Sequence, residues 1–460
     1  MITPSENETR TALIISTLAG FMTPFMASSV NVALPTIGKE YSLDPIALGW
    51  IATAYLLSAA IFLIPFGQLA DSYGRKKIFL LGIIVYSIFS FLIPSSGSGT
   101  VLIILRICQG VGAAMIFSTG VAILTSATPP PDRGKVLGIN VASVYLGLSL
   151  GPFLGGFLTE YFSWQSIFYI NGFFGLIVLI ITIRKLKGEW IGVRINKFDI
   201  MGTVLFCFSM TVLIVGFSRL HLQVGIWMVV TGIITGVFLI LWEKKASYPI
   251  ININLFVRNR AFTSSNVAAL INYCATAAVT FLMSLYLQNI KNLSPRTTGL
   301  VLVSQPICMA MISLFAGRLS DKIEPRYVAS FGMLMTVIGL FFFIFIHSES
   351  SIVFIILNLI LLGIGFGFFS SPNTNAIMSS VPKDMYGVAS ATVGTMRLSG
   401  QMLSMGIVLM MMSISAGSST VTNVDSNGFL MTVRNAFIVF TVICFIGVFF
   451  SLARGNIREK

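Results

Sequence analysis

Two stretches of the 460-residue chain carry the same pattern, GQLADSYGRKK at residues 67–77 and GRLSDKIEPRY at residues 317–327. At a constant offset of 250 residues they share three identities: Gly67 with Gly317, Leu69 with Leu319, and Asp71 with Asp321. Each stretch follows the second long apolar segment of its half of the chain. Two copies at equivalent places predict a parallel internal repeat, related by an axis along the membrane normal.

The composition places this repeat in a membrane. Hydrophobic residues make up 55% of the chain and charged residues only 10%, whereas soluble proteins carry roughly 25% charged residues. The apolar residues also form blocks of about 20, the length that an α-helix needs to cross a ~30 Å hydrocarbon layer. This pattern excludes a soluble enzyme, a disordered chain and a secreted disulfide scaffold. The five cysteines lie within apolar blocks without a CxxC spacing, which favours inert buried thiols.

Apolar segments bounded by charged, glycine or proline residues predict fourteen membrane spans. The first eight are 11–34, 48–70, 78–94, 100–124, 136–158, 166–183, 199–217 and 224–242. The other six are 262–289, 297–317, 327–347, 351–378, 388–412 and 433–453. We therefore expect an all-α polytopic membrane protein with two six-helix halves, residues 1–183 and 262–460. The linker between them, residues 184–261, would contribute two inserted helices.

The basic residues predict the direction of the spans. With both chain ends inside, 22 of the 29 lysines and arginines fall on the inner side, five on the outer side and two within spans. The outer side holds only Lys39, Arg219, Lys291, Arg296 and Arg434. Inner loops rich in Lys and Arg are the usual sign of orientation in a cell membrane. The net charge of +13 is thereby explained, without nucleic-acid binding, and both termini are expected to be cytoplasmic.

Several motifs occur in an order that resembles the major facilitator superfamily, and within it the 14-helix drug:proton antiporter branch. GQLADSYGRKK resembles the helix 2–3 signature of this superfamily. The other matching stretches are NVALP (31–35), LRICQGVGAA (105–114), PDRGK (131–135), GLSLGPFLGG (147–156), WQSIFYIN (164–171) and RLSGQMLS (397–404). The resemblance covers essentially the whole chain and implies a monomeric secondary transporter that exports amphiphilic compounds in exchange for protons.

Two positions depart from the branch. Met26 stands where a helix 1 acid is usual, five residues before the Asn of NVALP, and Ser404 stands where the helix 11 motif commonly ends in glycine. The missing acid matters, because a proton and a cationic substrate would normally compete for such a carboxylate.

The two loops of the repeat are expected to control the conformational change. The resemblance implies that Asp71 meets the N-terminus of a helix in the opposite half, a contact worth about 0.3–2 kcal/mol. The expected gating residues of both copies are Gly67, Asp71, Gly74, Arg75, Asp321 and Arg326. The alternative is a plain basic inner loop that only anchors the topology.

The GLSLGPFLGG stretch has no proton-carrying group, so its expected role is mechanical. Gly147, Gly151 and Gly155 are four residues apart and give one helix face that allows close helix contact. Pro152 removes a backbone hydrogen bond and kinks the helix. We interpret this face as part of the surface along which the halves rock, with ordinary small-residue packing as the alternative.

Two arginines lie within predicted spans, where a charge is expensive and marks a functional site by default. Arg106 lies about 9 Å along its span, so it could relay protons or contact substrate, or it could extend to the outer surface. Arg397 lies about 14 Å along its span, which favours a cavity residue over a structural hydrogen-bonding centre. Five further polar residues within spans are candidates for substrate contact or helix packing: Asn31, Gln109, Tyr145, Asn272 and Gln305.

All sixteen acidic residues fall in loops or at span ends. The leading hypothesis is proton-coupled export of amphiphilic drugs or small organic compounds by alternating access, with a peripheral acid such as Asp199, Glu160 or Glu243 as proton carrier. The alternative is export of a neutral or anionic metabolite, with Arg106 and Arg397 as counter-charges. No metal or cofactor site is indicated. A membrane-embedded enzyme is disfavoured because no nucleophile, base or metal cluster lies at a shared depth.

Overall fold

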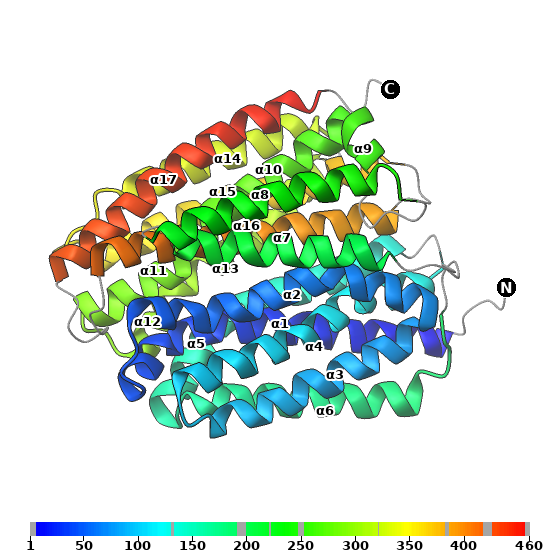
Figure 1. The fold of residues 1–460 in the computed structure, drawn as a ribbon, viewed down its shortest axis with the longest axis horizontal. Helices are drawn as coiled ribbons and strands as arrows, with labels where there is room; N and C mark the ends of the chain where they lie inside the picture. Colours follow the sequence, from blue (N-terminus) through cyan, green and yellow to red (C-terminus); the bar gives the residue numbers. More distant parts are fainter. Residues whose placement is uncertain are drawn as a thin grey trace.

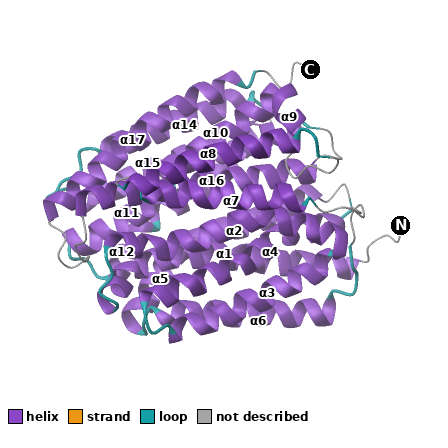
Figure 2. Cartoon of the chain, in the orientation of Figure 1, coloured by secondary structure: helices purple, strands orange, loops and turns teal. Residues whose placement is uncertain are grey.

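A computed structural model describes residues 6–129, 133–190, 199–219, 222–246, 253–320, 322–381, 386–416 and 426–455. Across these ranges the regular structure is helical, without a strand (Figure 2). Long helices run roughly side by side, and α1 begins at the same end of the bundle at which α17 finishes (Figure 1). An even number of crossings requires this arrangement.

The first group of helices comprises α1 Glu6–Glu40, α2 Pro45–Tyr73, α3 Arg75–Leu92, α4 Gly99–Ser126, α5 Arg133–Tyr161 and α6 Gln165–Lys185. An intervening pair follows, α7 Ile200–Ser218 and α8 Gln223–Glu243. The second group comprises α9 Ile253–Arg258, α10 Arg260–Thr276, α11 Val279–Leu285, η3 Tyr286–Ile290, α12 Pro295–Leu302, α13 Ser304–Ser320, α14 Pro325–Phe343, α15 Ile352–Ser379, α16 Tyr386–Ala416 and α17 Ser426–Ala453. A short 3₁₀ turn, η1 Ile93–Ser95, follows α3.

Side-chain caps fix several helix starts. The Asp44 carboxylate accepts the Ala47 backbone N–H at 2.6 Å, and Pro45 occupies the first turn of α2. Ser98, Ser351 and Asn259 cap α4, α15 and α10 in the same way. Each cap satisfies one of the first backbone donors, which have no partner inside the helix, and so helps to fix where the helix begins.

The internal repeat is visible in the packing. In the first group α1 packs on α5, α2 on α4, and α3 on α4 and α6. The second group repeats this pattern, with α10 on α16, α13 on α15, and α14 on α15 and α17. The contacts between the groups are also reciprocal, because α5 packs on α12 and α13 while α16 packs on α2. The repeat predicted from residues 67–77 and 317–327 therefore extends to the way in which the helices of each group pack.

Thirteen helices of the described chain are long and apolar enough to span a membrane. The remaining predicted span, 388–412, lies in the 31-residue helix α16. Two predicted spans are interrupted. The span 297–317 breaks at Val303 between α12 and α13, because Pro306 has no N–H to donate to the carbonyl of Leu302. The span 262–289 breaks between α10 and α11, where the Ala278 N–H donates to Ser404 Oγ at 3.0 Å.

The helix pair α7 and α8 lies beside the seam between the groups. In Figure 1, α7 runs between α2 and α16, and it packs on both. An apolar cluster joins the three helices through Leu57, Ala60 and Leu63 of α2, Ile214 of α7, and Leu398 and Met402 of α16. The outer helix α8 packs on α7 and leaves most of its length exposed, as expected for a helix that faces lipid.

Candidate functional site

The two helix groups meet directly at the end of the bundle opposite the chain termini. Ser284 Oγ donates to the backbone oxygen of Asn31 at 2.8 Å, and Gln288 Nε2 donates to that of Val32 at 2.9 Å. The sequence marked Asn31 as a candidate for substrate contact. The structure instead places its backbone in this contact between α1 and the α11–η3 segment.

A charged contact lies at the same end. Glu160, at the end of α5, accepts the backbone N–H of Arg296 in the first turn of α12 at 3.0 Å. The Arg296 guanidinium donates to Tyr161 Oη at 2.8 Å and lies 5.7 Å from the centre of that ring. We call Glu160, Tyr161 and Arg296 the outer latch, after the orientation that the basic residues of the sequence predict. It sets a carboxylate of one group against the positive end of a helix dipole in the other.

The small-residue face of α5 packs differently from the expectation. All three glycines of that face lie against α1 in their own group: Gly147, Gly151 and Gly155. The other group is approached at neighbouring positions, where Gly156 lies against the Pro295 carbonyl and Gly299 against the Pro152 carbonyl. Added Cβ atoms at Gly156 or Gly299 would overlap these carbonyls. Close contact is therefore present, but the surface between the groups is offset from the predicted glycine face.

Arg106 lies inside the first group. Its side chain is only 1% exposed, which excludes an extension to the surface. Its Nε donates to the Ile51 carbonyl at 3.1 Å and its Nη1 to Gln109 Oε1 at 2.6 Å. Gln109 Nε2 in turn donates to Ser90 Oγ at 2.7 Å, and the Arg106 guanidinium lies 4.3 Å from the centre of the Tyr55 ring. The Arg106–Gln109 pair thus joins α2, α3 and α4, away from the seam.

Arg397 lies at the seam. Its guanidinium, on α16, lies 5.9 Å from the centre of the Phe117 ring on α4 of the other group. Tyr145 Oη of α5 lies 2.7 Å from Ser370 Oγ of α15, which is a second link across the seam. Tyr145 also lies close enough to Arg397 and to Tyr273 to interact with them electrostatically. We call this set of five residues the central cluster: Phe117, Tyr145, Tyr273, Ser370 and Arg397.

The central cluster combines a cation, aromatic rings and hydroxyl groups between two groups of helices. Tyr273 packs edge-on against Phe366, with ring centres 5.2 Å apart, and extends the aromatic surface. Aromatic rings and a few convergent polar groups are the usual lining of a small-molecule site. The sequence pointed to Arg397 and Tyr145 through their polar groups, but it did not distinguish Phe117 among 38 phenylalanines or single out Ser370.

The other polar candidates lie outside the central cluster. Asn272 is fully buried, and neither its Oδ1 nor its Nδ2 has a hydrogen-bond partner among the described residues. Gln305 lies in α13, where its backbone carbonyl packs against Gly363 of α15. Both residues therefore lie within the second group.

The first of the two loops predicted to gate transport is held against its own group. Gly74 ends α2 with φ +114°, a conformation that favours glycine, and an added Cβ would lie 2.6 Å from Glu189 Oε1. The same carboxylate accepts the backbone N–H of Lys76 at 2.9 Å. Arg75 Nη1 donates to the Ala122 carbonyl at 3.3 Å. These bonds fasten the loop to α4 and to the segment after α6.

The remaining gating candidates are only partly described. Gly67 has space around it, since an added Cβ would make only ordinary van der Waals contact. The side chain of Asp71 and the whole of Asp321 lie outside the described part of the chain. Arg326 Nη2 donates to Tyr327 Oη, and its guanidinium lies 4.5 Å from the centre of that ring.

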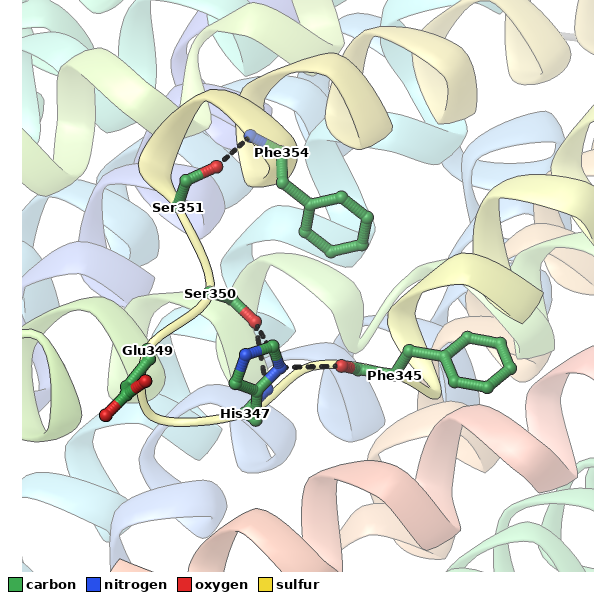
Figure 3. A pocket seen from close by; sticks show the side chains of 6 residues that line it. All are labelled: Phe345, His347, Glu349, Ser350, Ser351 and Phe354. Carbon is green, nitrogen blue, oxygen red and sulfur yellow. Dashed lines mark hydrogen bonds between the residues drawn. The ribbon is translucent and has the colours of Figure 1, made fainter.

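A surface cavity of about 300 Å³ lies in the loop between α14 and α15 (Figure 3). It is lined by Phe345, His347, Glu349, Ser350, Ser351 and Phe354. His347 Nδ1 lies 3.0 Å from Ser350 Oγ and 3.1 Å from the Phe345 carbonyl, so its ring is held by its own loop. The cavity belongs to one loop of the second group and has no lining residue from the first, unlike the central cluster.

Within the described ranges, no three His, Cys, Asp or Glu side chains lie close enough to hold a metal ion. The acidic residues of the candidate spans lie at or next to span ends: Glu8, Glu40, Glu160 and Glu243. Helix α16 contains no acid. The charge available at the centre of the seam is therefore that of Arg397.

Two repeated helical groups around a polar and aromatic seam define a membrane transporter built from parallel repeats. The chain belongs to the Major Facilitator Superfamily, which it matches over residues 16–193 and 266–459. The stretch between these matches contains α7 and α8. The chain is therefore a secondary transporter of this superfamily.

Curated relatives carry transporter names. The chain is 30% identical over 441 residues to riboflavin transporter RibZ of Clostridioides difficile (strain 630), with 95% of each chain covered. It is 29% identical over 412 residues to multidrug resistance protein Stp of Mycobacterium tuberculosis (strain CDC 1551 / Oshkosh), covering 87% of this chain and 76% of Stp. It is 26% identical over 338 residues to multidrug export protein EmrB of Escherichia coli (strain K12), covering 71% and 64%.

Solved structures share the fold. A bacterial homolog of the human lysosomal transporter Spinster, in an inward-facing and unoccupied conformation, matches with a TM-score of 0.72 and 16% identity over 98% of this chain and 97% of that one. A D-xylose-proton symporter matches with a TM-score of 0.69 and 14% identity, over 98% and 99% of the two chains. These structures confirm the predicted helical architecture, and the family match over residues 16–193 and 266–459 confirms the predicted superfamily.

Proposed function

We propose that this protein exports amphiphilic small organic compounds across the cell membrane in exchange for protons. The observation that carries the proposal is the central cluster, in which Arg397 and Phe117 meet across the seam. Such a site presents aromatic surface and polar groups to a ligand held between the two groups of helices. The printed names of Stp and EmrB, a multidrug resistance protein and a multidrug export protein, support the substrate class.

The proposed cycle is alternating access, in which the two groups rock about the central cluster. The outer latch and the contact of α1 with α11 would separate when the site opens outward. The gating loops would engage at the other end, with Asp71 and Asp321 against helix ends of the opposite group. In this proposal the termini are cytoplasmic, the protein acts as a monomer, and it carries out transport without catalysis.

A second candidate is transport of a neutral or anionic aromatic metabolite. It is favoured by the charge at the seam, because the candidate spans have acids only at their ends while Arg397 lies at the centre. A cation would meet a like charge there, whereas an anion or a polar aromatic ring would be attracted. The name of the relative RibZ, a riboflavin transporter, supports this candidate.

Transport in proteoliposomes tests both candidates. Purified protein is reconstituted with an imposed proton gradient, and uptake of the cationic dye ethidium is compared with uptake of riboflavin. Proton-driven ethidium uptake that changes in Arg397→Ala supports the first candidate. Riboflavin uptake without ethidium uptake supports the second. A matched control is Arg434→Ala, which removes an exposed arginine near the outer end of α17.

One further variant tests the proton coupling. Met26→Asp restores the acid that is usual in the resembled branch, at a position that is fully buried here. We expect it to change the dependence of uptake on the proton gradient. If neither compound is transported by the wild type, or if both rates are independent of the gradient, proton-coupled export is wrong.

A further inference from the structure

The end of α17 carries a buried arginine that the transport mechanism does not use. Arg454 follows the last residue of α17, and its side chain is only 2% exposed. Its Nε donates to the Ser451 carbonyl at 2.8 Å, and its Nη2 donates to Ser451 Oγ at 2.7 Å. Ser330 Oγ of α14 donates to the same hydroxyl at 2.8 Å. The guanidinium is thereby held against Ser451 of α17, the residue that bonds to α14.

One nitrogen of the Arg454 guanidinium makes none of these hydrogen bonds. Arg454 Nη1 is buried and has no hydrogen-bond partner among the described residues. The partners of its other nitrogens are a hydroxyl and a carbonyl, which are both neutral. Burial lowers the pKa of Arg454 to about 9, so the group still carries its charge at neutral pH. A buried charged donor without an acceptor is unfavourable, and an oxyanion is the partner that relieves it best.

A second guanidinium lies at the same end of the bundle. Arg326 is in the first turn of α14, one turn before Ser330, which is the residue that bonds to Ser451 at the end of α17. Its Nε is also buried without a hydrogen-bond partner among the described residues. Two arginines with donors to spare, on the adjoining ends of neighbouring helices, favour a group with several acceptor oxygens.

The surroundings favour a lipid as the source of these oxygens. Directly after Arg454, Gly455 has φ +78°, and an added Cβ there would meet no described atom within 4 Å. The last turns of α17 also expose Phe449, Phe450 and Leu452. A position next to the arginine that no described atom approaches, and apolar side chains along the helix, match a molecule with a charged head and acyl chains.

We propose that Arg454, together with Arg326, binds the phosphate group of an anionic membrane phospholipid at the ends of α14 and α17. The two spare guanidinium donors bind phosphate oxygens, and the acyl chains lie along the exposed face of α17. This site is separate from the central cluster, so the inference stands whatever the transported compound is.

Thermal unfolding of the purified full-length protein in a neutral detergent tests the site. The additions are phosphatidylglycerol, a galactosyl diacylglycerol with the same acyl chains but no phosphate, and inorganic phosphate. We expect phosphatidylglycerol to raise the Tm by several degrees more than the galactolipid does. The extra shift should disappear in Arg454→Gln. It should remain in Arg434→Gln, the matched control at the other end of the same helix.

Native mass spectrometry gives a second measurement that does not depend on the stability of Arg454→Gln. Arg454→Lys and Arg326→Gln should each retain phosphatidylglycerol about tenfold less than the wild type. The proposal is wrong if both lipids stabilise the wild type equally, or if Arg454→Gln keeps the full response. If inorganic phosphate alone gives the whole shift, the site binds a soluble anion and the assignment to a lipid is overturned.

Discussion

The two arginines within the membrane helices, Arg106 and Arg397, occupy opposite kinds of environment. Arg106 is enclosed by α2, α3 and α4, and its hydrogen bonds stay within the first group. Arg397 extends from α16 toward Phe117 of the other group. A contact within one group can persist while the groups rock, but a contact across the seam must change. The difference separates an arginine that holds one half together from one that can respond to substrate.

The largest effect expected from this comparison is on the stability of the first group. Arg106→Met should lower the free energy of unfolding by about 3 kcal/mol, because Gln109 and the Ile51 carbonyl lose their partner inside the membrane. Unfolding in detergent against a denaturant series measures the change, with Arg434→Met as control. Unchanged stability together with lost transport would instead give Arg106 a direct role in substrate or proton handling.

The next effect concerns transport at the seam. Arg397→Gln should reduce the initial rate in proteoliposomes about tenfold, equivalent to ~1.4 kcal/mol, while stability changes little. Phe117→Leu should act in the same direction, since it removes the ring that faces the guanidinium. If Arg397→Gln unfolds the protein as readily as Arg106→Met does, the contrast between the two arginines fails.

A smaller effect is expected at the break between α10 and α11. Ser404→Ala removes the acceptor of the Ala278 N–H and should destabilise the protein by about 1 kcal/mol. The control is Thr441→Val, because the Thr441 hydroxyl donates to the Phe437 carbonyl of its own helix and to no other described residue. Equal losses in the two variants would mean that the bond between helices has no special weight.

The smallest effect is expected at the outer latch. Glu160→Gln weakens the interaction with the start of α12 by about 0.5 kcal/mol, which should shift the balance toward outward opening about twofold. Spin labels on Phe162→Cys and Asn292→Cys, with the native cysteines replaced, report the distance across the latch. Glu349→Gln, in the loop between α14 and α15, is the control and should leave the distance distribution unchanged.

Much of the architecture follows from the sequence. The length of the apolar blocks predicted the helices, because the thickness of the hydrocarbon layer sets the length of a spanning helix. The repeated GxLxD pattern predicted the two groups, because each copy of the repeat packs in the same way. The break near Pro306 was also open to prediction, because proline lacks the N–H that a continuous helix requires.

The sequence predicted less well which helix packs against each helix face. Gly147, Gly151 and Gly155 predicted a close contact, but helical spacing does not say whether α1 or the other group makes it. For the same reason the sequence predicted the depth of Arg106 along its span, but not which neighbouring helices its side chain would contact. Ser404 was visible only as a departure from the resembled motif, and its bond to Ala278 depends on a helix 126 residues away in sequence.

The position of α7 makes the two sides of the transporter unequal. The seam formed by α2 and α16 is covered by α7, through Ile214 and through the Cys207 thiol, which donates to the Ile61 carbonyl at 3.4 Å. Among the described helices, none is inserted beside the reciprocal seam, which α5 forms with α12 and α13. A lipophilic compound that diffuses sideways out of the bilayer is therefore expected to enter between α5 and α13. The inserted pair would then act as a one-sided barrier that determines the direction of approach.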